Sequence, residues 1–196
     1  RRITTMGGDK FRDDFSLAFD GSDEYIDCGE KFELDTFTVS AWVKFTDTTT
    51  SQIIIGNRSE SAKGWICYLN ADQKPTLKVM GVTLTSTTVL SVNKWYHIVY
   101  TFHGGNDTLK IFLNGVLNAN VTSTTNTVAD CDPARIGIEA YNLNYDWFGN
   151  ISEVAVYNAD LSASQVATIY NGREPYNHRE GVASGNLQAW YRMGDG

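Results

Sequence analysis

Residues 94–115 read KWYHIVYTFHGGNDTLKIFLNG, and the fold can be worked out from this stretch. Two sets of apolar residues alternate along it: Tyr96, Ile98, Tyr100 and Phe102, then Leu109, Ile111 and Leu113. This alternation places each set on one face of an extended strand. Gly-Gly-Asn-Asp at 104–107 supplies the positive φ angles of a tight reversal, and Asn114-Gly115 suits a type I′ turn before a third strand. We therefore predict a central antiparallel meander, with the other elements packed around it.

Alternation of this kind recurs along most of the chain, and helical patterns are nearly absent. The clearest example runs from Phe37 to Phe45, where every second residue is apolar and shares one face. Trp42 on the opposite face indicates that this strand is covered on both sides. Further strands are predicted at 15–19, 25–28, 52–57, 65–69, 76–80, 82–84, 89–92, 134–139, 148–157 and 187–193. We expect the last of these strands to pair near the N-terminus.

One helix is predicted after residue 162. Ser162 and Gln165 are spaced as a capping box, and Leu161 and Val166 as a hydrophobic staple. Gly172 stands where such a helix should stop. Roughly a dozen short strands with one late helix predict an all-β protein, a two-sheet antiparallel jelly-roll β-sandwich.

Length and composition narrow the possible functions. The 196 residues are 42% hydrophobic, enough for one domain with a substantial core; we assign 1–14 to a polar lead-in and 15–196 to the domain, a module of a longer protein. A net charge of −7 argues against nucleic acid as a partner. No apolar run of about eighteen residues occurs, so no membrane span is predicted. The three cysteines fit no zinc motif, and buried free thiols are expected.

Short motifs follow one another in a particular order. They are FDG at 19–21, YI at 25–26, FTVSAWV at 37–43, WYHIVYT at 95–101, LKIFLNG at 109–115, FGNISEVAVYN at 148–158 and IYNG at 169–172. In order and spacing this series resembles a laminin G-like or pentraxin-like domain of the concanavalin A-like lectin/glucanase superfamily. The resemblance implies a jelly roll that binds glycans or proteins at loop rims or on its concave face, often near a structural calcium ion. The tail at 187–196 also resembles segments of phage and other viral structural proteins.

The glucanases of that superfamily carry Glu-x-Asp-x-x-Glu, whose carboxylates act as nucleophile and general acid. The nearest match here runs from Glu33 through Asp35 to Thr38, so the acid/base partner is missing. His97 lies within a predicted strand and is expected to be a hydrogen-bonded structural residue. We therefore predict that the chain has no enzymatic activity of its own.

Calcium is the favoured metal hypothesis. Acidic residues crowd the predicted turn at 20–27, and hard cations prefer several oxygen ligands at such bends. The resemblance implies that Asp20 and Glu153 approach each other, as in laminin G-like relatives, and that Glu139 matches an acidic position of pentraxin calcium sites. We name Asp20, Asp23, Glu139 and Glu153 as candidate ligands of one structural calcium ion.

The most suggestive binding stretch is the predicted loop at 141–147. Aromatic faces stack on sugar C–H surfaces, and amide and carboxylate groups bond to sugar hydroxyls. The candidate ligand-binding residues are Tyr141, Asn142, Asn144, Tyr145, Asp146 and Trp147. In the alternative interpretation, Tyr145 and Trp147 pack back onto the sheet edge and only brace the loop.

These observations favour a non-catalytic recognition or adhesion module. We expect it to bind a cell-surface glycan or protein, at a virion surface such as a tail fibre or in another extracellular protein. We also expect a homo-oligomer that contacts neighbouring subunits of a larger assembly. The alternative is a purely structural virion decoration or spacer domain, and a third reading is an accessory domain of a glycoside hydrolase.

Overall fold

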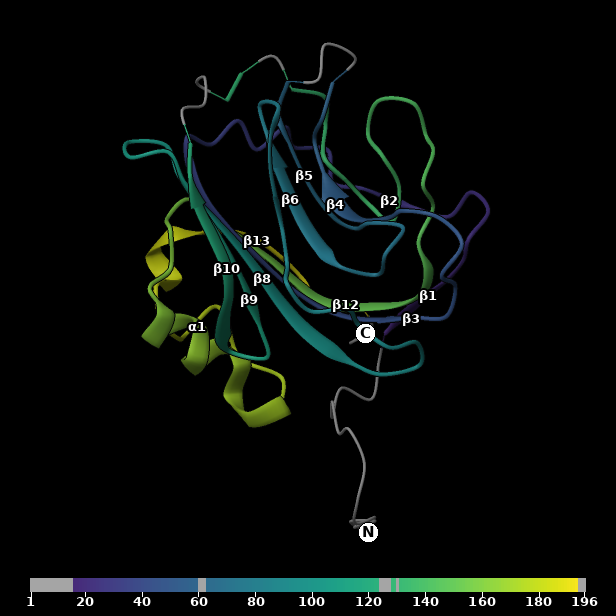
Figure 1. Cartoon of the computed structure of the whole chain (residues 1–196). Helices are drawn as coiled ribbons and strands as arrows, with labels where there is room; N and C mark the ends of the chain where they lie inside the picture. The colour runs from purple at the N-terminus through teal and green to yellow at the C-terminus, as the bar shows by residue number, and fades with distance from the viewer. Residues whose placement is uncertain (1–15, 60–62, 124–127, 130, 194–196) are drawn as a thin grey trace, which may run out of the picture.

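The computed structural model describes residues 16–59, 63–123, 128–129 and 131–193. Within these residues two antiparallel sheets pack face to face as a jelly-roll β-sandwich (Figure 1), which confirms the predicted fold class. The predicted lead-in at 1–14 lies outside the described residues.

The two sheets, as far as the chain is described, differ in strand number. Sheet A has seven strands, in the order β1-β12-β3-β8-β9-β10 with β13 paired to β12. Its strands are β1 (Leu17–Asp20), β3 (Thr36–Phe45), β8 (Tyr96–His103), β9 (Thr108–Leu113), β10 (Val116–Thr122), β12 (Phe148–Tyr157) and β13 (Leu187–Tyr191). Sheet B has six strands, in the order β2-β11-β4-β5-β6-β7. They are β2 (Ile26–Asp27), β11 (Arg135–Ile136), β4 (Gln52–Gly56), β5 (Trp65–Leu69), β6 (Pro75–Val79) and β7 (Val82–Thr85).

The predicted meander is formed by β8, β9 and β10, which are neighbours in sheet A. At the turn between β9 and β10, Asn114 and Gly115 have φ angles of 49° and 80°, as a type I′ turn requires. Strand β3 lies between β8 and β12. Trp42 on β3 is only 3% exposed, so both faces of this strand are covered as predicted.

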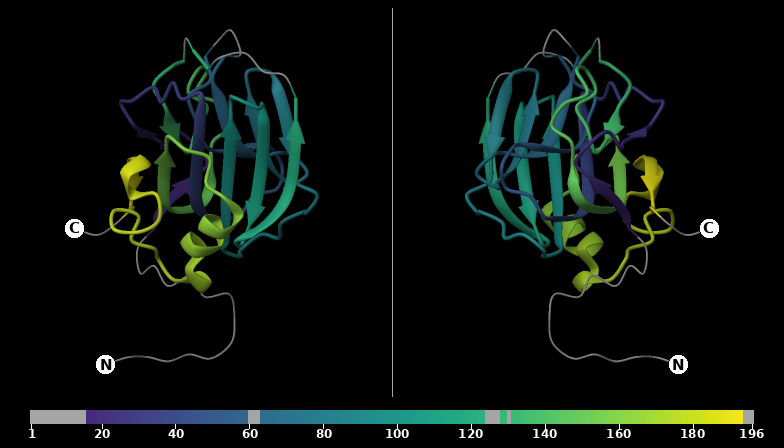
Figure 2. Two further views of the ribbon diagram at one scale, coloured as in Figure 1. Left: turned by 90° about the vertical axis from the view of Figure 1, so that its left-hand side faces the viewer. Right: turned by 90° about the vertical axis from the view of Figure 1, so that its right-hand side faces the viewer.

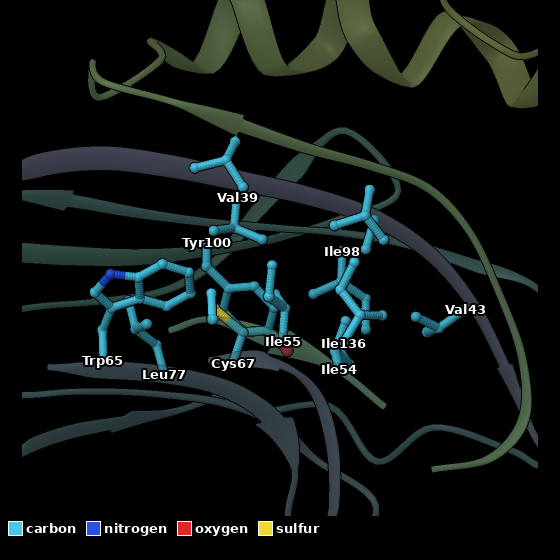
Figure 3. Packing of buried hydrophobic residues seen from close by; sticks show 14 of the residues in the cluster. Val39, Val43, Ile54, Ile55, Trp65, Cys67, Leu77, Ile98, Tyr100 and Ile136 are labelled. Carbon is cyan, nitrogen blue, oxygen red and sulfur yellow. The ribbon is translucent and has the colours of Figure 1, made fainter. Parts of the chain in front are cut away.

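Alternating side chains from both sheets meet in the interior (Figure 3). Val39, Val43, Ile98 and Tyr100 of sheet A face Ile54, Ile55, Trp65, Cys67, Leu77 and Ile136 of sheet B. Trp65 is fully buried, lies 4.9 Å from Phe37 between ring centroids, and donates its indole N–H to the carbonyl of Phe32. Cys67 and Cys131 are buried, as predicted, whereas Cys28 is only partly buried. Burial of this kind is the main source of stability for a two-sheet sandwich.

The predicted helix is α1 (Ala163–Tyr170), and its capping box is formed by Ser162 and Gln165. It ends at Asn171 in the left-handed conformation, one residue before the predicted glycine stop. Helix α1, η1 (Asn171–Arg173) and η2 (Ser184–Asn186) lie on the side of sheet A away from sheet B (Figures 1 and 2). Among the described residues no helix is both long and apolar enough to cross a membrane.

Two predicted strands differ from the structure. Residues 89–92 form no strand; instead the N–H of Leu90 donates to the carbonyl of Gln73, which lies in the turn between β5 and β6. The strand predicted at 134–139 shortens to β11, because the chain bends at Gly137, whose φ is 92°. The last strand, β13, pairs with the second half of β12, whose first half pairs with β1.

Candidate functional site

The outer face of sheet B carries the candidate site. Strands β5 and β6 point Trp65, Cys67 and Leu77 into the interior, so the residues between them point outward. Ile66 pairs with Lys78 on this outer face. No described helix covers this side of the sandwich (Figure 1).

A hollow of about 190 Å³ lies on this face, and we call it the Lys78 hollow. It is lined by Ser51, Ile53, Arg58, Ile66, Tyr68, Lys78, Glu139 and Tyr145. The two isoleucines belong to neither interior cluster and give the hollow an apolar floor. Apolar and aromatic walls with a few placed polar groups are typical of sites for small ligands.

An ion pair at the edge of this hollow joins residues 81 positions apart. An Arg58 guanidinium nitrogen lies 2.6 Å from Glu139 Oε1, and the two side chains are 27% and 2% exposed. The buried carboxylate requires this partner, because an unpaired buried charge is strongly destabilising. Its other oxygen, Oε2, is buried without a hydrogen-bond partner among the described residues. The pair therefore fixes Arg58 at the hollow and leaves one acceptor unsatisfied there.

Lys78 is the second cation of the hollow. Its side chain is partly exposed, and in the part of the chain that the structure describes no carboxylate lies within ion-pair distance of it. With Arg58 balanced by Glu139, Lys78 leaves the hollow with a net positive charge. Burial raises the pKa of Tyr68, and the charge of Arg58 partly opposes this shift. The phenol of Tyr68 therefore stays neutral and keeps its hydroxyl proton.

The loop between β11 and β12 forms one wall of the hollow. The Tyr145 carbonyl accepts from the N–H of Ile53 at 2.9 Å, which ties the loop to β4. Leu143 and Tyr145 have φ angles of 54° and 62°, in the left-handed region that side chains other than glycine seldom adopt. Tyr145 is consequently turned outward and is 49% exposed, whereas Trp147 is turned inward and is fully buried.

The predicted ligand-binding residues are therefore divided between surface and core. Tyr141 is 42% exposed, Asn142 and Asn144 are also exposed, and Asp146 is partly buried. Trp147 packs edge-on against Phe45, with ring centroids 6.5 Å apart, so the prediction that it contacts a ligand is wrong. The bracing interpretation is correct for Trp147, while Tyr145 keeps an open ring face.

A second hollow, the Asp146 hollow, has a volume of about 470 Å³. It is lined by Gly21, Asp47, Thr49, Thr50, Asn144, Tyr145, Asp146 and Phe148. Burial raises the pKa of Asp146, and the carboxylates of Asp23 and Asp20 raise it further. Hydrogen bonds from Thr49 lower the pKa of Asp47. Tyr145 lines both hollows.

The four predicted calcium ligands do not converge. Asp20 pairs with Phe148 at the start of β12, whereas Glu153 lies at a bulge farther along the same strand. The Glu153 carboxylate accepts from Trp190 Nε1 at 2.8 Å, and Glu139 is paired with Arg58. Among the described residues no three His, Cys, Asp or Glu side chains gather closely enough to hold a metal ion. Calcium binding stays a prediction from the sequence. Asp20, Asp23, Glu139 and Glu153 do not form one set of ligands in this structure.

The incomplete glucanase motif has a structural role. Glu33 Oε1 accepts from the N–H of Cys131, and Asp35 Oδ1 accepts from the N–H of Val128. Both carboxylates thus hold the segment before β11. His97 is 1% exposed and its Nε2 lies 2.8 Å from Ser40 Oγ, which confirms its predicted structural role.

Reasoning from the sequence missed Tyr68 and Lys78 as site residues, and it included Arg58 only as part of a candidate rim loop at 57–63. Tyr68 and Lys78 carry a usable signal, since each alternates with interior residues along its strand and must face outward. Arg58 falls in a loop next to residues that the structure does not describe, and no local pattern pairs it with Glu139. Only the folded chain brings these groups together.

The fold and the site together define a jelly-roll β-sandwich with a polar, aromatic-lined hollow on its uncovered face. Residues 20–167 match a laminin G family model described as the concanavalin A-like lectin/glucanases superfamily. The chain therefore belongs to this superfamily, as its motifs indicated. A comparison with curated protein sequences found no match.

Several solved structures share the fold. The IT-sialidase CBM40 of Ruminococcus gnavus bound to α2,3-sialyllactose aligns with a TM-score of 0.68 and 16% identity, over 80% of this chain and 96% of that one. A proposed carbohydrate-binding protein from Bacteroides ovatus aligns with a TM-score of 0.68 and 18% identity, over 91% of this chain and 51% of that one, so the chain spans about half its length. A heptameric SAP-like pentraxin from Limulus polyphemus aligns with a TM-score of 0.60 and 14% identity, over 80% of this chain and 82% of that one. At these identities the likeness establishes the fold alone.

Proposed function

We propose that the chain is a non-catalytic recognition module that binds a glycan through an acidic sugar in the Lys78 hollow. The observation that carries the proposal is the combination of phenol rings, a guanidinium and an ammonium group in one hollow on the open face. Aromatic faces offer apolar area to sugar C–H groups, and cations form strong charge-assisted hydrogen bonds with carboxylates.

Each side chain has a distinct role in this proposal. Arg58 is held by the buried Glu139, so its guanidinium stays at the hollow and loses little further side-chain freedom when a ligand binds. Lys78 supplies the uncompensated charge that attracts a carboxylate. Tyr145 supplies a ring on a loop fixed by its bond to Ile53, so binding orders little additional structure.

Two of the structural neighbours support a carbohydrate ligand. One neighbour is a CBM40 bound to a sialylated sugar, and another is a proposed carbohydrate-binding protein. We extend this chemistry to the present chain and place it outside the cell, where it would meet a cell-surface glycan. A place in a virion and homo-oligomeric assembly stay predictions from the sequence.

A second candidate function uses the same binding site, but in an accessory domain of a glycoside hydrolase. The CBM40 neighbour belongs, by its name, to an IT-sialidase. This favours the reading of the chain as an accessory domain that holds a glycoside hydrolase on its substrate. A catalytic domain in the same polypeptide would support that reading, and the binding experiment below applies equally to it.

The test is binding to an array of sialylated, uronic acid-containing and neutral glycans. We expect acidic glycans to be preferred, and Lys78→Met to weaken their binding about tenfold, because a hydrogen bond to a charged group is lost. Lys110→Met is the matched control, since Lys110 is 31% exposed on sheet A and pairs with Asp160 instead. Equal effects of the two variants would overturn the assignment to this hollow. Absence of binding to every glycan, with oligomers in solution, would favour the structural alternative.

A further inference from the structure

We propose that the glycan site continues past Tyr145 into the Asp146 hollow, which takes neutral sugar units. The inference rests on the proposed function and deepens it by naming the substrate class. That class is an oligosaccharide with one acidic end unit, bound in the Lys78 hollow, followed by neutral units in the Asp146 hollow.

Tyr145 is shared by the two hollows. It lines both of them and is 49% exposed. Its carbonyl is held by the N–H of Ile53, and the adjacent Asn144 carbonyl accepts from the N–H of Glu139 at 3.0 Å. The loop is therefore held by two backbone hydrogen bonds, and Tyr145 borders both hollows. A chain of sugars bound in one hollow would meet this residue and pass to the other.

The Asp146 hollow has the chemistry of a site for sugar hydroxyls. Asn144 contributes an amide, and Thr49 contributes a hydroxyl. Asp146 contributes a carboxylate whose Oδ1 is buried without a hydrogen-bond partner among the described residues. Buried polar atoms are usually hydrogen-bonded, so this oxygen marks a place for a donor. Phe148, 42% exposed, offers a second ring to this hollow.

Charge sets the direction in which a ligand would lie. The Lys78 hollow is positive, because Lys78 adds to an already balanced Arg58–Glu139 pair. The Asp146 hollow contains two carboxylates, and none of the described residues that line it is Lys or Arg. A sugar carboxylate is therefore attracted to the first hollow and repelled from the second. The second hollow is also the larger, at about 470 Å³ against about 190 Å³, and has room for more than one neutral unit.

The test compares three probes by calorimetry: the methyl glycoside of N-acetylneuraminic acid, α2,3-sialyllactose and lactose. We expect the wild-type protein to bind the trisaccharide about tenfold more tightly than the acidic monosaccharide, and lactose weakly. Asp146→Ala and Phe148→Ala should each abolish most of this gain and leave monosaccharide affinity within about twofold. Lys78→Met should weaken both acidic probes alike. Circular dichroism and urea unfolding of each variant verify that it is folded.

The outcomes separate this inference from the proposed function. Monosaccharide binding that depends on Lys78, without any gain for the trisaccharide, would overturn the inference and leave the proposed function standing. A gain that persists in both Asp146→Ala and Phe148→Ala would also overturn it. A gain that vanishes in EDTA and returns with CaCl₂ would assign the Asp146 hollow to a cation instead of a sugar. Failure of both acidic probes to bind would overturn both proposals.

Discussion

The outer face of sheet A is covered by α1 and the segment that follows it, whereas the outer face of sheet B carries the Lys78 hollow. On the covered face a second cluster of fully buried residues forms around Val99, Phe112 and Tyr157. Tyr170 stacks there on Trp42, with ring centroids 5.8 Å apart. On the open face, Tyr68 and Lys78 keep part of their surface in solvent.

Unpartnered polar groups occur on both faces, and those of the open face border the Lys78 hollow. On the covered face Thr38 donates to the carbonyl of Ala159 and accepts from the N–H of Leu161, whereas His97 Nδ1 and Thr101 Oγ1 are buried without a hydrogen-bond partner among the described residues. On the open face Lys78 has no ion-pair partner among the described residues, and Glu139 keeps one unsatisfied oxygen. A polar group without an internal partner, placed at a hollow, is available to an external one.

Among substitutions on the covered face, the largest expected effect is at Ile169. Ile169, on α1, is 1% exposed and packs in the second cluster. Ile169→Ala should lower the free energy of unfolding by about 2–4 kcal/mol, because buried methyl groups are replaced by a cavity. Urea unfolding measures this loss, with Val116→Ala as the control, since Val116 is 69% exposed and should change stability by less than about 0.5 kcal/mol. A loss below about 1 kcal/mol for Ile169→Ala would mean that α1 contributes little to the covered face.

Acid should also destabilise the covered face, through two buried histidines. Burial lowers the pKa of His97 to about 3 and that of His178 to about 4. Below pH 6.5 the unfolded chain takes up protons on these residues while the native state does not, so stability present at neutral pH is lost as the pH falls. At pH 5 the loss is about 2 kcal/mol for each histidine.

Urea unfolding at pH 7.5 and pH 5 measures this dependence. His178→Gln removes one titrating group, and we expect it to reduce the difference between the two pH values by about 2 kcal/mol relative to wild type. Carboxylates elsewhere titrate equally in both proteins and cancel in the comparison. If His178→Gln left the difference between pH 7.5 and pH 5 unchanged, His178 would be protonated in the native state at pH 5.

Local patterns predicted most of the covered face but little of the open one. The alternation of Phe37 to Phe45 and the capping box at Ser162 are properties of neighbouring residues, so they could be read directly from the chain. Tyr145 is exposed and Trp147 is buried because of positive φ angles at Leu143 and Tyr145. These angles cannot be predicted from the residue types at the two positions.

The sequence also does not show which of the two sheets has its outer face covered. Strand β5 reads WICYL, with apolar or aromatic residues on both faces, so its sequence does not say which face stays open. The Arg58–Glu139 pair spans 81 positions, and its existence follows only from the way loops from different parts of the chain meet beside sheet B. The candidate site was therefore predictable as a loop, but not as a hollow that combines loop and sheet residues.

The smallest expected effect on stability belongs to the open face. Tyr145→Ala and Lys78→Met should each change the free energy of unfolding by less than about 0.5 kcal/mol, because both side chains are partly exposed and remove no interior contact. Urea unfolding at pH 7.5 measures these differences beside Trp147→Ala, which removes a fully buried ring from the same loop and should cost about 3–5 kcal/mol. If Tyr145→Ala cost as much as Trp147→Ala, the Tyr145 ring would be a brace of the loop, and its exposed face would no longer argue for a ligand. A neutral result, combined with weaker glycan binding, would mean that this side chain is retained for recognition and not for folding.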